Sequence, residues 1–233
     1  MLQQACQPVP ASLRRVDVAL APFWHTRALT LLLLTVAITG TALDSAAAPV
    51  APSSLAQSYL ALLLVNLGLA FYAARLGLQS SVFWQLVGRS EPGRWRPALA
   101  WAIALSVLIL GAESALQLWL GMPESVAARS LLPRLASEKA SWVLLAFVVG
   151  ATEELVYRGY LRQQLQALSG SVALAVLLQG LLFGIAHGSQ GAWAVARFAA
   201  YGVALGCVAQ RERSIVPCVL CHVGLDMYAG LVT

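Results

Sequence analysis

The sequence predicts an all-α protein, a polytopic transmembrane helical bundle, and three observations support this fold class. Of the 233 residues, 59% are hydrophobic and 11% are charged, whereas soluble domains carry about 25% charged residues. Mean hydropathy is +0.75. Apolar segments of about 20 residues, the length that crosses a hydrocarbon core, recur along the chain, and backbone groups in lipid must be satisfied within helices. We expect about seven spans, or eight.

Charged and turn residues separate seven candidate spans. In order they cover residues 28–43, 55–74, 97–111, 142–161, 171–187, 192–210 and 214–232. The first resembles the apolar region of a signal peptide, because Arg14, Arg15 and Arg27 precede it. Since further spans follow, we interpret it as a retained signal anchor.

The connection before the fourth span has a mixed character. Residues 124–139 combine charges with Leu131, Leu132 and Leu135, which is typical of an amphipathic helix lying in the membrane interface. Residues 115–135 could instead contain an eighth span. This segment also carries Arg129, Arg134 and Lys139, which do not fit the charge pattern of the other connections.

Basic residues predict the orientation in the membrane. The formal net charge is +5, and all but one of the 15 basic residues are arginines. Most lie in connections that fall on one side of the bundle: Arg14, Arg15, Arg27, Arg75, Arg89, Arg94, Arg96, Arg158, Arg162, Arg211 and Arg213. That side should be cytoplasmic and should hold the N-terminus. The scattered arginines do not indicate nucleic-acid binding. The arginine-rich, lysine-poor composition favours a bacterial plasma membrane.

Ionisable residues concentrate in the apolar helices of the C-terminal half. They are Glu153, Glu154, Arg158, His187, Arg197, His222 and Asp226. Because such a residue costs about 2.5–3.5 kcal/mol at membrane depth, each is a candidate functional residue. For Arg197 we favour a packing role between helices or one directed to the cytoplasm over a contact with substrate.

Helical spacing divides the residues of the stretch GATEELVYRGYL. Glu154 and Arg158 are four residues apart on one face, which predicts an ion pair. Glu153 points about 100° away, with Tyr157 at the same spacing. Glu153 therefore lacks a local counter-charge and is the candidate general base. An inert packing network is the alternative.

Two further pairs share the four-residue spacing, Phe183 with His187 and His222 with Asp226. Together, Glu153-Glu154-x-x-x-Arg158, Phe183-x-x-x-His187 and His222-x-x-x-Asp226, in this order on three hydrophobic helices, resemble the CPBP intramembrane proteases. These include the CaaX prenyl endopeptidases and bacteriocin-processing or immunity-type homologues. The resemblance covers residues 139–230. It divides the chain into N-terminal transmembrane helices with an interfacial segment, residues 1–138, and a catalytic helical core, residues 139–233.

The resemblance implies a metal-independent glutamic endopeptidase that needs no cofactor. Glu153 with His187 would activate a water molecule, Glu154 and Arg158 would orient the site, and Phe183 with Tyr157 would shape the substrate pocket. His222 and Asp226 would form an oxyanion hole. The family position aligned with Asp226 is commonly asparagine, so Asp226 is either protonated or accepts a hydrogen bond from His222.

The implied partners are membrane lipids and a peptide or protein substrate, lipid-modified or membrane-associated. A prenylated CaaX peptide, a bacteriocin-like leader and a signalling peptide are all compatible.

Other functions fit the sequence less well. The run Cys218-x-x-Cys221-His222 matches a haem-attachment pattern, but its thiols lie within an apolar helix, where we expect cysteines that pack as small hydrophobes. A zinc protease could in principle use His187, His222, Glu153 and Asp226 as ligands, but the motif H-E-x-x-H is absent from the sequence. A proton-coupled transporter would be expected to show internal repeats, and we see none in the sequence. A non-catalytic membrane scaffold or immunity-type protein stays open, since motifs alone do not demonstrate turnover.

Overall fold

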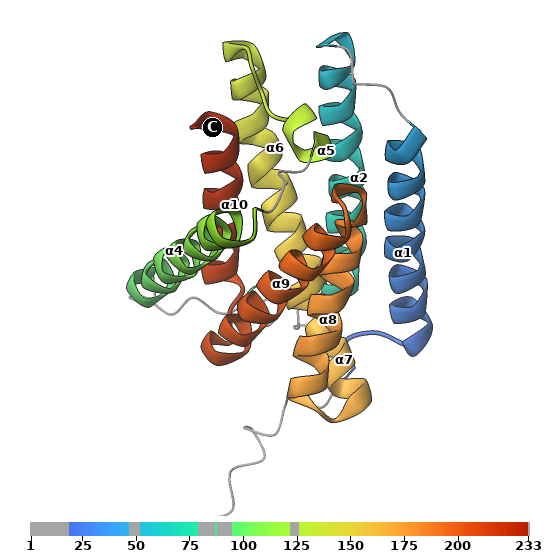
Figure 1. The fold of residues 1–233 in the computed structure, drawn as a ribbon. Coiled ribbons are helices and arrows are strands. Elements are labelled where there is room, and N and C mark those ends of the chain that lie inside the picture. Colours follow the sequence, from blue (N-terminus) through green and yellow to red (C-terminus); the bar gives the residue numbers. More distant parts are fainter. Residues whose placement is uncertain (1–18, 47–51, 79–86, 88–94, 122–125, 233) are drawn as a thin grey trace, which may run out of the picture.

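The computed structural model describes residues 19–46, 52–78, 87, 95–121 and 126–232. All regular secondary structure within these ranges is helical (Figure 1). The predicted all-α class is therefore confirmed.

The helices follow the predicted spans closely. The N-terminal part contains α1 (Phe23–Ala46), α2 (Pro52–Leu78), α4 (Trp95–Leu120) and the short α5 (Val126–Ser130). Next, α6 (Ala136–Glu154) continues through a π-helical segment, η2 (Leu155–Leu161), into α7 (Arg162–Ser169). The chain ends with α8 (Val172–Ala186), the 3-10 turn η3 (Gly188–Gln190), α9 (Ala192–Glu212) and α10 (Val216–Leu231).

Four of the described helices are long and apolar enough to cross a membrane. They comprise Leu55–Arg75, Trp95–Leu120, Ala136–Ser169 and Ala192–Glu212. Three shorter apolar helices coincide with the other predicted spans: Phe23–Thr39, Val172–Ala186 and Val216–Leu231. The chain is an integral membrane protein, and the number of spans that cross completely stays a prediction.

The third span and the connection after it differ from the predictions. Helix α4 does not end at Gly111 but continues to Leu120 and includes Glu113, whose carboxylate pairs with Arg197 of α9 at 3.3 Å. The negative charge of Glu113, which follows the predicted end of the span, is thus neutralised by an arginine of another helix.

The described part of the predicted amphipathic helix, residues 126–139, is not one continuous helix, and residues 124 and 125 lie outside the described ranges. Helix α5 ends at Ser130, and Pro133, which disfavours helix in the residue before it, separates it from α6. The Glu138 carboxylate accepts hydrogen bonds from the backbone N–H groups of Arg134 and Leu135 and fixes the start of α6. The described part of 115–135 is likewise no single span, because α4 ends before Gly121, which has a φ of +58°; residues 122–125 lie outside the described ranges.

Close packing of α8 on α9 brings the C-terminal helices together. A Cβ on Gly180 would lie 2.7 Å from Val203 Cγ2, and one on Gly202 would lie 2.7 Å from the Cα of Gly180. The two backbones therefore approach where neither helix has a side chain. In Figure 1, α6 stands between α10 and α2, and both contact it. Residues of α1, α2, η2 and α8 share one buried cluster, so the N-terminal helices pack directly against the C-terminal part.

Helix ends that carry arginine gather at one end of the bundle. Arg75 lies in the last turn of α2 and Arg211 in the last turn of α9, and both ends are at the lower side of Figure 1, as is the start of α1. Arg158 and Arg162, which were counted at the end of the fourth span, lie within the helical run and are buried, with relative exposures of 0% and 7%. Arg14, Arg15, Arg89 and Arg94 lie outside the described residues, and the cytoplasmic assignment stays a prediction.

Candidate active site

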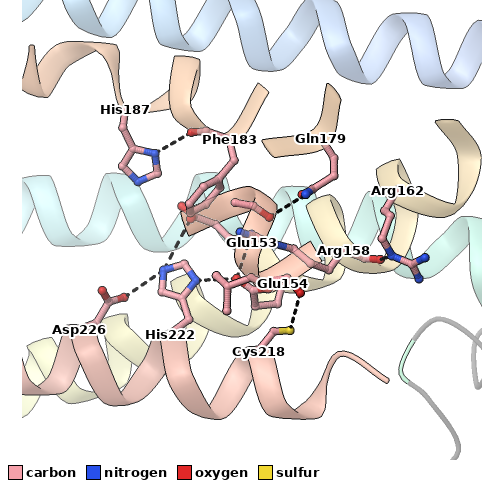
Figure 2. A network of polar contacts seen from close by, with 12 residues as sticks. Glu153, Glu154, Arg158, Arg162, Gln179, Phe183, His187, Cys218, His222 and Asp226 are labelled. Atoms are coloured by element: carbon pink, nitrogen blue, oxygen red, sulfur yellow. Dashed lines mark hydrogen bonds and ion pairs between the residues drawn. The ribbon is translucent and has the colours of Figure 1, made fainter. Parts of the chain in front are cut away.

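The ionisable residues predicted from the motifs meet where three helical segments pack (Figure 2). The α6–η2 segment contributes Glu153, Glu154 and Arg158; α8 and its C-terminal cap contribute Phe183 and His187; α10 contributes His222 and Asp226. In Figure 2, His187 and Asp226 lie towards one end of this cluster and Arg162 lies at the other.

The predicted ion pair between Glu154 and Arg158 is present. Arg158 Nη1 donates to Glu154 Oε1 at 3.0 Å, and both side chains are fully buried. Arg158 lies in the π-helical turn, and π-helical segments occur frequently at functional sites. Its guanidinium also stacks over the Phe183 ring, with Cζ 4.2 Å from the ring centre. These two contacts offset part of the hydration that Arg158 loses on burial, and its Nε and Nη2 have no hydrogen-bond partner among the described residues.

Glu154 has a second partner that the sequence did not predict. Nδ1 of His222 lies 2.8 Å from Glu154 Oε1. Because an ionised carboxylate only accepts hydrogen bonds, this contact assigns a proton to Nδ1. The other ring nitrogen, Nε2, then faces two carboxylates, Glu153 Oε2 at 3.8 Å and Asp226 Oδ2 at 3.7 Å.

Solvent exposure divides the cluster into a fully buried part and an accessible edge. The side chains of Glu153 and Asp226 are 23% and 32% exposed and that of His222 is 12% exposed, whereas Glu154 and Arg158 are fully buried. Glu153 Oε2 is nevertheless buried and accepts no hydrogen bond from the described residues. Oε2 of Glu154 likewise accepts no hydrogen bond from the described residues, but that side chain is fully buried, so Glu153 is the more accessible of the two adjacent glutamates.

His187 is held by contacts of a different kind. Its Nδ1 donates to the Phe183 carbonyl at 2.8 Å, which leaves Nε2 as an acceptor. Its ring stacks on Phe198, with centroids 3.8 Å apart and planes 19° apart. No hydrogen bond or ion pair joins His187 to Glu153 in the described part of the chain. Their cooperation in water activation therefore stays a prediction.

The two predicted pocket residues are buried. Phe183 and Tyr157 are 2% and 3% exposed and pack edge to face at 5.1 Å. Phe183 contacts the rings of both His187 and His222, at 4.7 Å and 5.9 Å between centroids. Phe183 therefore helps to set the separation of the two histidine rings. A role for Phe183 and Tyr157 in contacting substrate stays a prediction.

Residues of α9 complete the surroundings of His187, and sequence reasoning missed one of them. Phe198 carried no signal, because an aromatic residue in an apolar helix is ordinary. Arg197 was expected either to pack between helices or to be directed to the cytoplasm, and its ion pair with Glu113 of α4 favours the first of these roles.

Alternative ligand chemistries find limited support. Among the described residues, no group of three His, Cys, Asp or Glu side chains is arranged to hold a metal ion. The Cys218 and Cys221 thiols are fully buried. Cys218 Sγ donates to the Leu205 carbonyl, and the Ser106 hydroxyl donates to Cys221 Sγ. Both cysteines therefore behave as packed core residues.

One comparison with known proteins finds a family model whose range includes the polar cluster. Residues 135–228 match the family described as type II CAAX prenyl endopeptidase, Rce1-like. No curated protein and no solved structure matches the chain. The matched range contains every residue of the polar cluster, from Glu153 to Asp226. Residues 135–228 of this membrane protein are thus similar to the Rce1-like type II CAAX prenyl endopeptidases, and this similarity supports a peptidase.

Proposed function

We propose that the protein is an intramembrane endopeptidase that hydrolyses a peptide bond with water activated by a glutamate and a histidine, without a metal ion. One observation carries the proposal: two adjacent glutamates have opposite environments. Glu154 is sealed and bound to Arg158 and His222, whereas Glu153 lies at the accessible edge with an oxygen that accepts no hydrogen bond from the described residues. Such a carboxylate is free to take a proton from water.

In the proposed reaction, Glu153 removes a proton from water while the water oxygen bonds to the carbonyl carbon of the substrate. His187 Nε2, an acceptor because Nδ1 binds the Phe183 carbonyl, orients the second water proton. The carbonyl π electrons move to oxygen and form a tetrahedral oxyanion. When this intermediate collapses, the C–N bond breaks and Glu153 returns its proton to the leaving amine.

His222 is the proposed donor to the oxyanion. Nδ1 is committed to Glu154, so a ring that carries both protons presents Nε2–H at the accessible edge. The surrounding carboxylates balance the charge of such a ring. Removing one donor of this kind typically costs about 100–1,000-fold in rate. The sealed Glu154–Arg158 pair keeps the ring in place and does not touch the reacting atoms.

The proposed substrate is a peptide or protein that reaches the site from the membrane. The family description names a CAAX prenyl endopeptidase, so prenylated CAAX peptides are the first candidates to test. The accessible edge also suits an unmodified membrane-associated peptide, so the test includes substrates of both kinds.

The decisive experiment compares peptide termini by mass spectrometry in membranes that contain the wild-type chain, Glu153→Gln or Glu212→Gln, all in the presence of a chelator. Glu212 lies in the last turn of α9 and serves as the matched control. A second arm adds a synthetic CAAX peptide with or without its prenyl group. We expect new termini with wild type and Glu212→Gln, and none with Glu153→Gln. Identical termini in all three, with each protein folded, would favour the scaffold interpretation.

A further inference from the structure

We propose that Phe198 is a positioning residue for His187, held in place by the Arg197–Glu113 ion pair. This inference rests on the proposed function, because it assigns His187 a role in orienting water. It adds a residue outside the three motifs and connects the site to α4, a helix outside the family match.

Three contacts fix the His187 ring. One face stacks on Phe198 at 3.8 Å, and Phe183 contacts the ring at 4.7 Å with planes 61° apart. The Nδ1 hydrogen bond to the Phe183 carbonyl sets the rotation of the ring within its plane. His187 caps α8, with φ −97° and ψ 15°, where the helical backbone has ended. Side-chain contacts therefore determine where Nε2 points.

The Phe198 ring is itself held on several sides. Tyr201 packs edge to face against it at 5.8 Å, and Phe183 does so at 6.1 Å. The guanidinium of Arg197 lies over the ring, with Cζ 5.2 Å from its centre. Arg197 Nη1 in turn pairs with Glu113 Oε1 at 3.3 Å. A continuous series of contacts thus runs from α4 through α9 to the catalytic histidine.

The separation of α8 and α9 sets the stacking distance. A Cβ on Gly184, three residues before His187, would lie 2.7 Å from Ala199 Cβ and 2.8 Å from Ala199 N. Ala199 directly follows Phe198 in the chain. Because no side chain separates the helices here, the two rings meet at van der Waals distance. The His187 ring needs a flat partner at this distance. A residue that only filled the core would not have to be flat, so this requirement distinguishes a positioning role from core filling.

The test uses the purified full-length chain in detergent micelles with histidine labelled at both ring nitrogens. The sequence has three histidines, so His25→Asn and His187→Asn variants assign the spectrum. The test variants are Phe198→Leu, which removes the flat face, and Phe198→Tyr, which keeps it. Phe147→Leu is the matched control, since Phe147 is 56% exposed on α6. The same samples are assayed for kcat and KM with the peptide found in the proteolysis experiment.

We expect Phe198→Leu to mix the two neutral tautomers of His187, because the ring can leave the Phe183 carbonyl. The ring-nitrogen signals then move far more than the loss of a ring current alone would cause. The kcat should fall about 10- to 100-fold with KM within twofold, the loss that misplacement by about 1 Å produces. Phe198→Tyr should restore both, and Phe147→Leu should change neither.

Two results would overturn the positioning role. One is a folded Phe198→Leu variant with an unchanged His187 tautomer and unchanged kcat. The other is an equal loss of kcat in Phe147→Leu, which would indicate general packing. If the wild-type chain cleaves no peptide, the proposed function fails, and the tautomer of His187 in Phe198→Leu alone decides whether Phe198 fixes the ring.

Discussion

Nδ1 of His222 on α10 lies 2.8 Å from Oε1 of Glu154 on α6, and the same oxygen accepts from Arg158 at 3.0 Å. A single buried carboxylate oxygen thus holds an arginine from its own helix and a histidine from another. If Glu154 is lost, Arg158 becomes an uncompensated buried charge and His222 loses its anchor. The neighbouring Glu153 makes neither hydrogen bond, and its Oε2 lies 3.8 Å from His222 Nε2.

Glu154→Gln should therefore lower the stability of the folded protein strongly. Removing one partner of a buried ion pair typically lowers the free energy of unfolding by about 3–5 kcal/mol. Unfolding in detergent, followed by tryptophan fluorescence, measures the loss. Activity should fall as well, because the His222 ring is no longer fixed.

Glu153→Gln is the matched control, one residue away and 23% exposed. It should keep the wild-type unfolding midpoint and lose about 100- to 10,000-fold in kcat, the range for removal of a general base. Equal destabilisation by the two substitutions would contradict the division of labour between the glutamates.

Asp226→Asn should keep peptidase activity within about tenfold of wild type. The Asp226 carboxylate lies 3.7 Å from His222 Nε2 at the accessible edge, and an asparagine amide can donate to an oxyanion there, which an ionised carboxylate cannot. Asp226→Leu removes every polar atom and should lose about 100-fold or more. Peptide hydrolysis by the two variants measures the difference; full activity in Asp226→Leu would remove Asp226 from the site.

Gly184→Ala should destabilise the protein by about 1–3 kcal/mol or more, because the added Cβ would overlap the Val195 carbonyl oxygen and push α8 from α9. Gly111→Ala in α4 meets no atom within 4 Å and should be neutral or stabilising. Thermal unfolding of both variants in the same detergent tests this. A Gly184→Ala midpoint at or above that of Gly111→Ala would show that the close approach is not required.

Gln164→Ala should release the chain segment that precedes α1. The buried Gln164 side chain accepts from the Leu20 N–H at 2.8 Å and donates to the Ala21 carbonyl at 2.6 Å. Losing both bonds leaves buried backbone groups unpaired, at about 1–3 kcal/mol each. Limited proteolysis should then cut near residues 19–22. Gln163→Ala removes only a bond within its own helix, to the Gly159 carbonyl, and should leave these sites protected.

Contacts within one helix were predictable from the sequence, and contacts between helices were not. The Glu154–Arg158 pair follows from four-residue spacing, and the structure confirms it. The bond between Glu154 and His222 joins residues 68 positions apart and depends on how α6 meets α10. The periodicity of the sequence does not predict how these two helices pack.

Glu113 and Phe198 were missed for related reasons. A glutamate in a span suggests a helix end unless its partner is known, and that partner, Arg197, lies on α9. The stack of Phe198 on His187 depends on glycines of α8 and α9 that bring the helices together. Gly180 and Gly184, like Gly202 and Gly206, are four residues apart, and this spacing was the available signal for the close approach.

The π-helical turn at Leu155–Leu161 also constrains how the chain can change length during evolution. Such a segment accommodates one residue more than an α-helix, so deleting one residue there would restore a regular α-helix while the helices on either side kept their directions. Arg162 and Gln164 would then keep their buried positions, whereas Arg158, inside the turn, would be displaced from Glu154. Relatives that lack one residue within Leu155–Leu161 should therefore also lack the Glu154–Arg158 pair, and other changes of length are expected after the left-handed Gly170 that ends α7.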